Sequence, residues 1–201
     1  MGFAGAFSSL SAYTLYSVFL LQGKADTNVI TWTLWALESI LSFHIYRKQV
    51  DGDFPKYLEE LVAAIGCCAV TALLFSRALI VHVDILKELQ WVDGISVLLF
   101  LIVLYIYKTA DDVWSATIAF QGVLIFSSLP LVRNVYQNPT GEPLLPWILW
   151  SIGFLLQLLC VIARSGGLSS SYRTFPTPLN YFFWHGLIAV IVLNSSGHLF
   201  K

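Results

Sequence analysis

Seven continuous apolar runs, each about as long as a membrane-spanning helix, dominate this chain of 201 residues. A helix that crosses the hydrocarbon of a bilayer needs roughly 20 such residues. Because backbone polar groups cannot stay unpaired in lipid, runs of this kind must be helices, and a β-barrel would show shorter segments of alternating polarity. The runs cover residues 3–22, 29–46, 59–83, 91–108, 114–136, 144–163 and 179–199.

The composition points to the same class of protein. Only 11% of the residues are charged and 57% are apolar, whereas a soluble domain usually carries about 25% charged residues. So few charges cannot cover a water-facing surface, which argues against a soluble enzyme, a disordered chain or a disulfide scaffold. We expect an all-α, multi-pass integral membrane protein whose main partner is the lipid bilayer. The net charge of −1 indicates no nucleic-acid partner.

A repeated tryptophan motif divides the chain into two halves. Trp32 to Trp35 reads WTLW, and Trp147 to Trp150 reads WILW, 115 residues later and again at the start of an apolar run. The spacing predicts two three-helix repeats joined by a linker helix, a 3+1+3 plan, with units at 1–86, 87–112 and 113–201. Three helices plus a linker orient both repeats alike across the membrane. Coincidence is the alternative, since the chain has seven tryptophans.

The stretch 127–150 also carries a proline, a polar helix end, a small polar turn and then a helix that contains tryptophan. Pro130, Asn134, Trp147 and Trp150 occupy these places, and in this the chain resembles the PQ-loop family, to which SWEET sugar transporters are related. Two departures stand out: Leu131 replaces the glutamine that follows the family's proline, and no proline precedes residue 55 in the first half.

The resemblance implies a transporter that moves a small polar solute (a sugar, amino acid or vitamin) by alternating access at a central site. SWEET-like proteins bind sugar with the help of an asparagine on the last helix, and Asn194 resembles that residue. The last run also places Trp184 and His185 among aromatic residues. An indole ring beside amide or imidazole groups suits a small polar ligand, although a tryptophan near a membrane surface is also a common lipid anchor.

Glu38 is the most informative single residue, because it lies in the middle of the second apolar run. An ionisable group at that depth is costly, and it usually faces a bundle interior or a wet cavity. The residue predicts a site in the solute pathway that could also carry a coupling proton. The alternative is a structural carboxyl that is hydrogen-bonded to a neighbouring helix. Arg77, in the third run, could reach towards Glu38 or extend outwards to the membrane surface.

The four tryptophans of the repeated motif have two interpretations. Trp32 and Trp35 lie on one face of a helix, as do Trp147 and Trp150. The paired faces could line a central path for the solute. Tryptophans at the start of a span are also typical anchors at the membrane interface.

Other functions receive less support. The four histidines are scattered and form no HxxxH or HExxH motif, and the three cysteines have no metal-ligand spacing, so we expect no metal site, no cofactor and no enzyme. A sensor, receptor or assembly subunit that does not transport is the alternative function. Basic residues are spread over both ends of the spans and leave the orientation open, and the sequence also leaves open whether the chain forms a homo-oligomer.

Overall fold

A computed structural model describes residues 1–25, 27–81 and 91–195. Within these ranges the chain forms seven α-helices and one short 3-10 helix, and it has no strands. The elements are α1 (Gly2–Leu21), α2 (Val29–Gln49), α3 (Phe54–Val81), α4 (Trp91–Thr109), α5 (Val113–Gln137), η2 (Pro139–Gly141), α6 (Leu144–Arg164) and α7 (Pro176–Ser195). The all-helical prediction and the seven predicted helices are confirmed. The predicted boundary between residues 86 and 87 lies outside the described residues.

Local signals explain where several helices begin. The Asn28 side chain accepts hydrogen bonds from the backbone N–H groups of Ile30 and Thr31 at 2.7 and 3.1 Å, which caps α2. Asp112 caps α5 in the same way. Helix α3 begins at Phe54, five residues before the predicted start, with a proline in its first turn. The charged residues around the predicted start of this apolar run therefore lie inside the helix.

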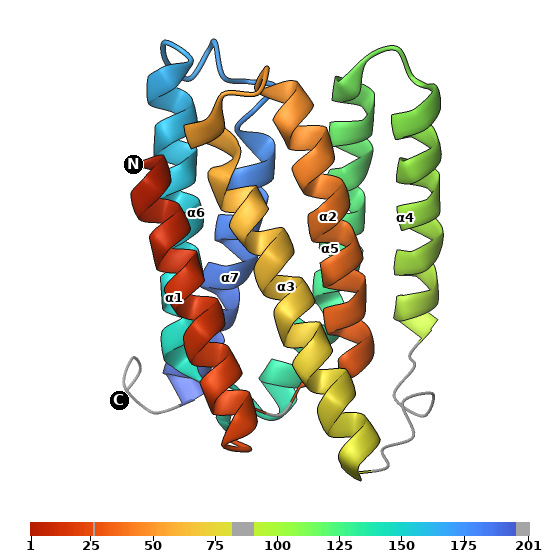
Figure 1. Ribbon diagram of the computed structural model, residues 1–201, viewed down its shortest axis with the longest axis vertical. Coiled ribbons are helices and arrows are strands. Elements are labelled where there is room, and N and C mark those ends of the chain that lie inside the picture. The colour runs from red at the N-terminus through yellow and green to blue at the C-terminus, as the bar shows by residue number, and fades with distance from the viewer. Residues whose placement is uncertain (26, 82–90, 196–201) are drawn as a thin grey trace.

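Six of the helices form a closed ring, and the seventh packs outside it. Going round the ring, the order is α1, α3, α2, α5, α7 and α6, and α6 packs again on α1. Successive helices along the chain run in opposite directions, and α4 stands at one edge against α5 and α2 (Figure 1). The side chains at the centre of the ring therefore come from both halves of the sequence.

Six of the seven helices are long and apolar enough to cross a membrane, and α2 is the exception. Large apolar side chains point outwards from these helices, as Phe7, Leu79 and Tyr105 do. Such extensive apolar exposure fits contact with lipid and not with water. The protein is therefore an integral, multi-pass membrane protein. Helix α2 is less apolar because it carries Glu38, Ser39 and Ser42, and all three of these side chains are buried.

Glycines allow α1 and α6 to approach closely. A Cβ atom added to Gly5 would lie 2.8 Å from the carbonyl oxygen of Gly153, which is nearer than such contacts allow. Small residues at a crossing let two backbones pack directly, and this is a common way to hold helices together in lipid. This contact closes the ring of helices between α1 and α6.

Candidate functional site

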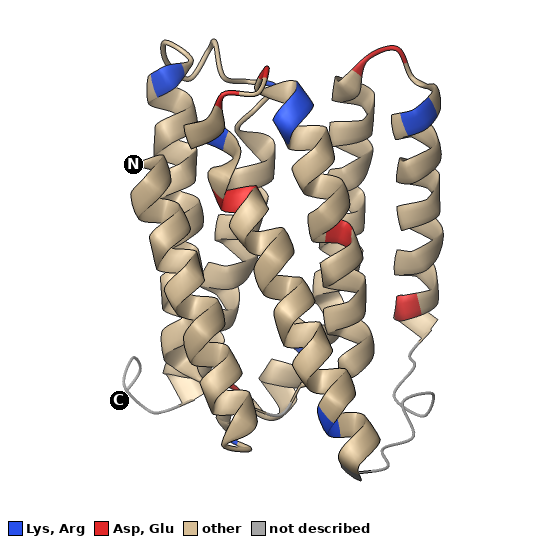
Figure 2. Ribbon diagram, viewed as in Figure 1, with Lys and Arg blue, Asp and Glu red and all other residues tan. Residues whose placement is uncertain are grey.

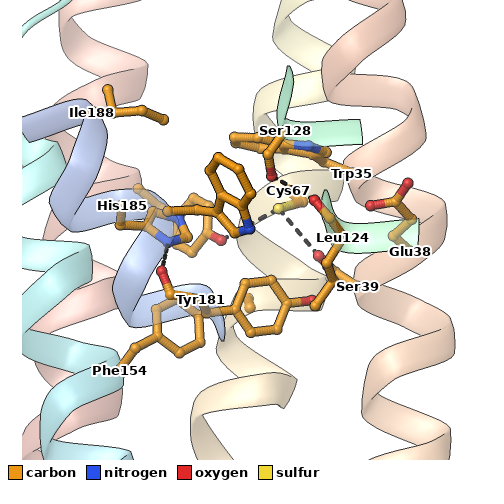
Figure 3. A pocket seen from close by; sticks show the side chains of 13 residues that line it. Trp35, Glu38, Ser39, Cys67, Leu124, Ser128, Phe154, Tyr181, His185 and Ile188 are labelled. Atoms are coloured by element: carbon orange, nitrogen blue, oxygen red, sulfur yellow. Dashed lines mark hydrogen bonds between the residues drawn. The ribbon is translucent and has the colours of Figure 1, made fainter. Parts of the chain in front are cut away.

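A cavity lies at the centre of the ring, and every ring helix contributes to its wall. Helix α4 contributes nothing to it. The lining side chains are Tyr13 from α1, Trp35, Glu38 and Ser39 from α2, Ala63 and Cys67 from α3, Leu124 and Ser128 from α5, Phe154 from α6, and Tyr181, Trp184, His185 and Ile188 from α7. Figure 3 shows Trp35 and Glu38 on one side of the cavity and His185 on another. Residues far apart in the sequence thus meet at one point in the membrane interior.

Glu38 is the one carboxyl side chain on the wall of this cavity. Its side chain is 1% exposed, and its Oε2 atom accepts a hydrogen bond of 2.7 Å from Ser127 Oγ. The other carboxyl oxygen, Oε1, has no hydrogen-bond partner. The Trp184 indole N–H, which belongs to another lining residue, has none either. Buried polar atoms are nearly always paired, so two unpaired ones on the wall of one cavity are unusual.

The remaining polar groups of the wall are paired within the protein. The Ser39 hydroxyl donates to Cys67 Sγ at 3.4 Å, and Tyr13 OH lies 3.3 Å from the same sulfur. The Nδ1 atom of His185 lies 2.7 Å from the Tyr181 carbonyl oxygen, and its ring stacks on Phe154 with 5.1 Å between centroids. The hydrogen bond and the ring contact fix the orientation of the His185 side chain.

The cavity has a volume of about 30 Å³, which is enough for one or two water molecules. Its wall is mainly aromatic and aliphatic. A solute as large as a sugar or an amino acid needs the surrounding helices to move apart before it can enter.

The repeated tryptophans meet in the protein interior beside this cavity. The rings of Trp32 and Trp150 are 6.1 Å apart, and those of Trp35 and Trp147 are 6.2 Å apart. Trp32, Trp147 and Trp150 are almost completely buried, so they contact one another and not the lipid interface. Of the four, only Trp35 lines the cavity itself.

A buried carboxyl holds one end of this tryptophan cluster. Glu142, in the connection before α6, accepts hydrogen bonds from Tyr16 OH at 3.2 Å and from Trp147 Nε1 at 3.1 Å. The Tyr16 ring packs on Trp32 with 5.0 Å between centroids. The interaction ties α1 and α6 to the connection that leads into α6.

Besides Trp32, Trp147 and Trp150, three further predicted pathway residues lie away from the cavity wall. Pro130 is buried inside α5, one turn beyond Ser127, and Asn134 is half-buried in the last turn of the same helix. Asn194 is exposed in the last turn of α7. Arg77 donates to the Leu20 carbonyl oxygen at 3.3 Å, at the end of α1, and it forms no ion pair with Glu38. Trp35, Glu38, Trp184 and His185 are the predicted residues that the fold brings together around the cavity.

The sequence analysis missed two buried carboxyl groups on α3. Glu59 and Glu60 are both 0% exposed. Ser42 Oγ donates to Glu60 Oε2 at 2.9 Å, and the buried Ser9 hydroxyl lies beside Glu59. Figure 2 shows an acidic segment on α3 that is separate from the acidic segment on α2. Pro55 was the available signal, because a proline in a first turn would start the helix early enough to enclose both residues.

In the part of the chain that the structure describes, no three histidine, cysteine, aspartate or glutamate side chains are grouped so that they could hold a metal ion. His82 and His198 lie outside the described residues. No model of a known protein family, no curated protein and no solved structure matches the chain. The resemblance to the PQ-loop family therefore rests on the residues quoted above.

Proposed function

We propose that this protein transports a small polar solute across the membrane through the central cavity. The observation that carries the proposal is the pair of unpaired polar atoms on the cavity wall, Glu38 Oε1 and Trp184 Nε1. An ionisable group inside a membrane is expensive to keep, and it is typical of a substrate or ion pathway. Leaving such atoms without partners costs free energy that a polar ligand would recover.

The chemistry of these atoms describes the solute. Glu38 Oε1 accepts a hydrogen bond, and the Trp184 indole donates one. The rings of Trp35 and Phe154 offer flat apolar surfaces next to these groups. A solute with hydrogen-bonding groups at its edge and an apolar face, such as a sugar, an amino acid or a vitamin, fits this combination. Proton coupling through Glu38 is part of the proposal.

The order of helices in the ring supports a mechanism of alternating access by two repeats. If α1, α2 and α3 are exchanged with α5, α6 and α7, respectively, every pair of neighbouring helices in the ring becomes another pair of neighbouring helices. The same exchange converts the Trp32–Trp150 contact into the Trp147–Trp35 contact, and the two distances differ by only 0.1 Å (6.1 and 6.2 Å). We propose that these units move against each other and open the cavity to each side in turn.

The first experiment is thermal unfolding of the purified protein with a panel of sugars, amino acids and vitamins. A ligand at 100 times its dissociation constant stabilises its protein by roughly 2.7 kcal/mol. We expect the Trp184→Phe and Glu38→Gln variants to lose the response. Trp91→Phe is the matched control, since Trp91 is 76% exposed on α4. Uptake of the same ligand into proteoliposomes then tests transport itself.

A receptor or assembly subunit that does not transport is the second candidate. The small volume of the cavity favours it, because a packed interior needs no solute. Binding of a ligand without uptake would support a receptor. A stable protein that responds to no ligand of the panel would contradict the transporter and favour an assembly subunit.

A further inference from the structure

A groove with a volume of about 320 Å³ lies on the outside of the ring, between α2 and α4. Five of its lining side chains are apolar, namely Leu37, Ile40 and Leu41 from α2 and Phe100 and Leu104 from α4. Leu37 is 45% exposed and Ile40 is 40% exposed, so the groove opens towards the lipid. It shares no lining residue with the central cavity. Figure 1 shows α4 at the edge of the bundle, next to α2.

One end of this groove is polar. His44, Tyr107 and Lys108 complete the lining, and they lie closer to the ends of α2 and α4 than the apolar residues do. Lys48, one turn beyond His44, reaches across to α4, because its ammonium lies 4.5 Å from the centre of the Tyr107 ring. The two helices run in the same direction, and Figure 2 shows basic segments at this end of both. Basic groups therefore gather where the groove meets the membrane surface.

No carboxylate neutralises these basic groups. Among the described residues, neither Lys48 nor Lys108 takes part in an ion pair. The carboxylates nearest in the sequence are Asp51, beyond α2, and Asp111 and Asp112, beyond α4, and none of them lines the groove. The Asp112 side chain is engaged as the cap of α5. An anion at this end of the groove would therefore meet two lysine side chains that lack a negative partner.

We propose that the groove binds one anionic phospholipid, with an acyl chain along the apolar side chains and the phosphate beside Lys48 and Lys108. Basic pockets between membrane helices bind the headgroups of such lipids. From Phe100 to Lys108 the helix rises about 12 Å, so the groove takes the headgroup and the adjoining part of a chain. A free phosphate ion would use only the basic end. The lipid site lies outside the ring and does not depend on the proposed transport of a solute.

Native mass spectrometry of the purified full-length protein tests the site. Phosphatidylglycerol and phosphatidylcholine with identical acyl chains are added in equal amounts, and the bound lipid is identified by its mass. We expect one phosphatidylglycerol to bind first. Each lysine near a membrane surface contributes roughly a fivefold preference for an anionic lipid. Lys48→Gln should lower the preference by about that factor, and Lys48→Gln combined with Lys108→Gln should abolish it. Both lysines are exposed, so these variants should fold like the wild type.

Two matched controls separate the groove from the rest of the surface. Arg47→Gln removes the same charge from the same turn of α2, but the Arg47 guanidinium carbon lies 5.9 Å from the centre of the Tyr57 ring on α3. This variant should keep the preference. Ile40→Trp fills the apolar part of the groove without changing the charge, and it should weaken phosphatidylglycerol binding. Ile118→Trp, at a position of α5 that is 50% exposed, should leave binding unchanged.

Several results would overturn the lipid site. Equal binding of the two lipids, or a preference that survives the loss of both lysines, would remove the headgroup site. Equal losses in Lys48→Gln and Arg47→Gln would show a general attraction of the basic surface and no site. Displacement of the lipid by inorganic phosphate, or full binding in Ile40→Trp, would leave a phosphate site without a place for the chain. Glu38→Gln should lose the response to solute and keep the lipid preference, which separates this proposal from the proposed function.

Discussion

At the scale of single residues, the interior of this protein combines polar groups that are paired with polar groups that are not. Tyr16 and Tyr46 are both almost fully buried. The Tyr16 hydroxyl donates to Glu142, whereas the Tyr46 hydroxyl has no partner. Burial alone therefore says little about what a hydroxyl contributes to stability, and each one depends on its hydrogen bonds.

These two tyrosines make a matched pair of variants. Tyr16→Phe leaves the buried Glu142 carboxyl without one of its donors and should lower the free energy of unfolding by about 1–3 kcal/mol. Tyr46→Phe removes a hydroxyl that has no partner and should be neutral or stabilising. Thermal unfolding in one detergent measures both variants, and equal losses of stability would contradict the role given to Glu142.

The two serines beside Glu38 allow a similar comparison. Ser127 Oγ donates to Glu38, whereas Ser128 Oγ donates back to the Leu124 carbonyl oxygen of its own helix at 2.7 Å. Ser127→Ala should cost about 1–3 kcal/mol, because it leaves the buried carboxyl with no partner. Ser128→Ala should change stability by less than about 0.5 kcal/mol, as is usual away from such networks. Unfolding curves that coincide for the two variants would mean that the Glu38 hydrogen bond contributes nothing.

At the scale of the helices, the crossing of α1 and α6 depends on glycines, which have no side chain, at the point of contact. A methyl group at Gly5 would meet the Gly153 backbone, which has little freedom to move. Gly122 on α5 has nothing within 4 Å of the same position. Gly5→Ala should therefore lower stability by roughly 1–3 kcal/mol through overpacking, and Gly122→Ala should raise it by up to about 1 kcal/mol through helix propensity. Comparing their unfolding temperatures tests the crossing, and a stabilised Gly5→Ala would show that it is loose.

The sequence predicted the helices better than it predicted what they bury. Apolar runs give the existence of a membrane helix, because length and composition decide insertion. Apolar runs do not show which face of a helix points into the protein. The repeated tryptophans therefore had two interpretations until their contacts were known. Glu38 was recognisable because it stands alone in an apolar run. Glu59 and Glu60 were missed because they stand beside Lys56 at the edge of a run, where charged residues usually meet water.

At the scale of the whole molecule, α2 decides how the chain crosses the membrane. By length and composition alone it falls short of a spanning helix, so a simple count gives six crossings. Its 21 residues nevertheless extend over about 32 Å, and it packs between α3 and α5 in the ring. Its polar residues face the interior, where other helices and not lipid surround them. We therefore expect α2 to cross the bilayer like the other six helices.

An odd number of crossings places the two ends of the chain on opposite sides of the membrane. Reporter domains fused separately to each terminus, one fluorescent only in the cytosol and one active only outside it, should give opposite results in the same cells. If both fusions reported the same side, the number of crossings would be even and α2 would not cross the membrane. Glu38 would then not lie at the depth on which the solute site depends.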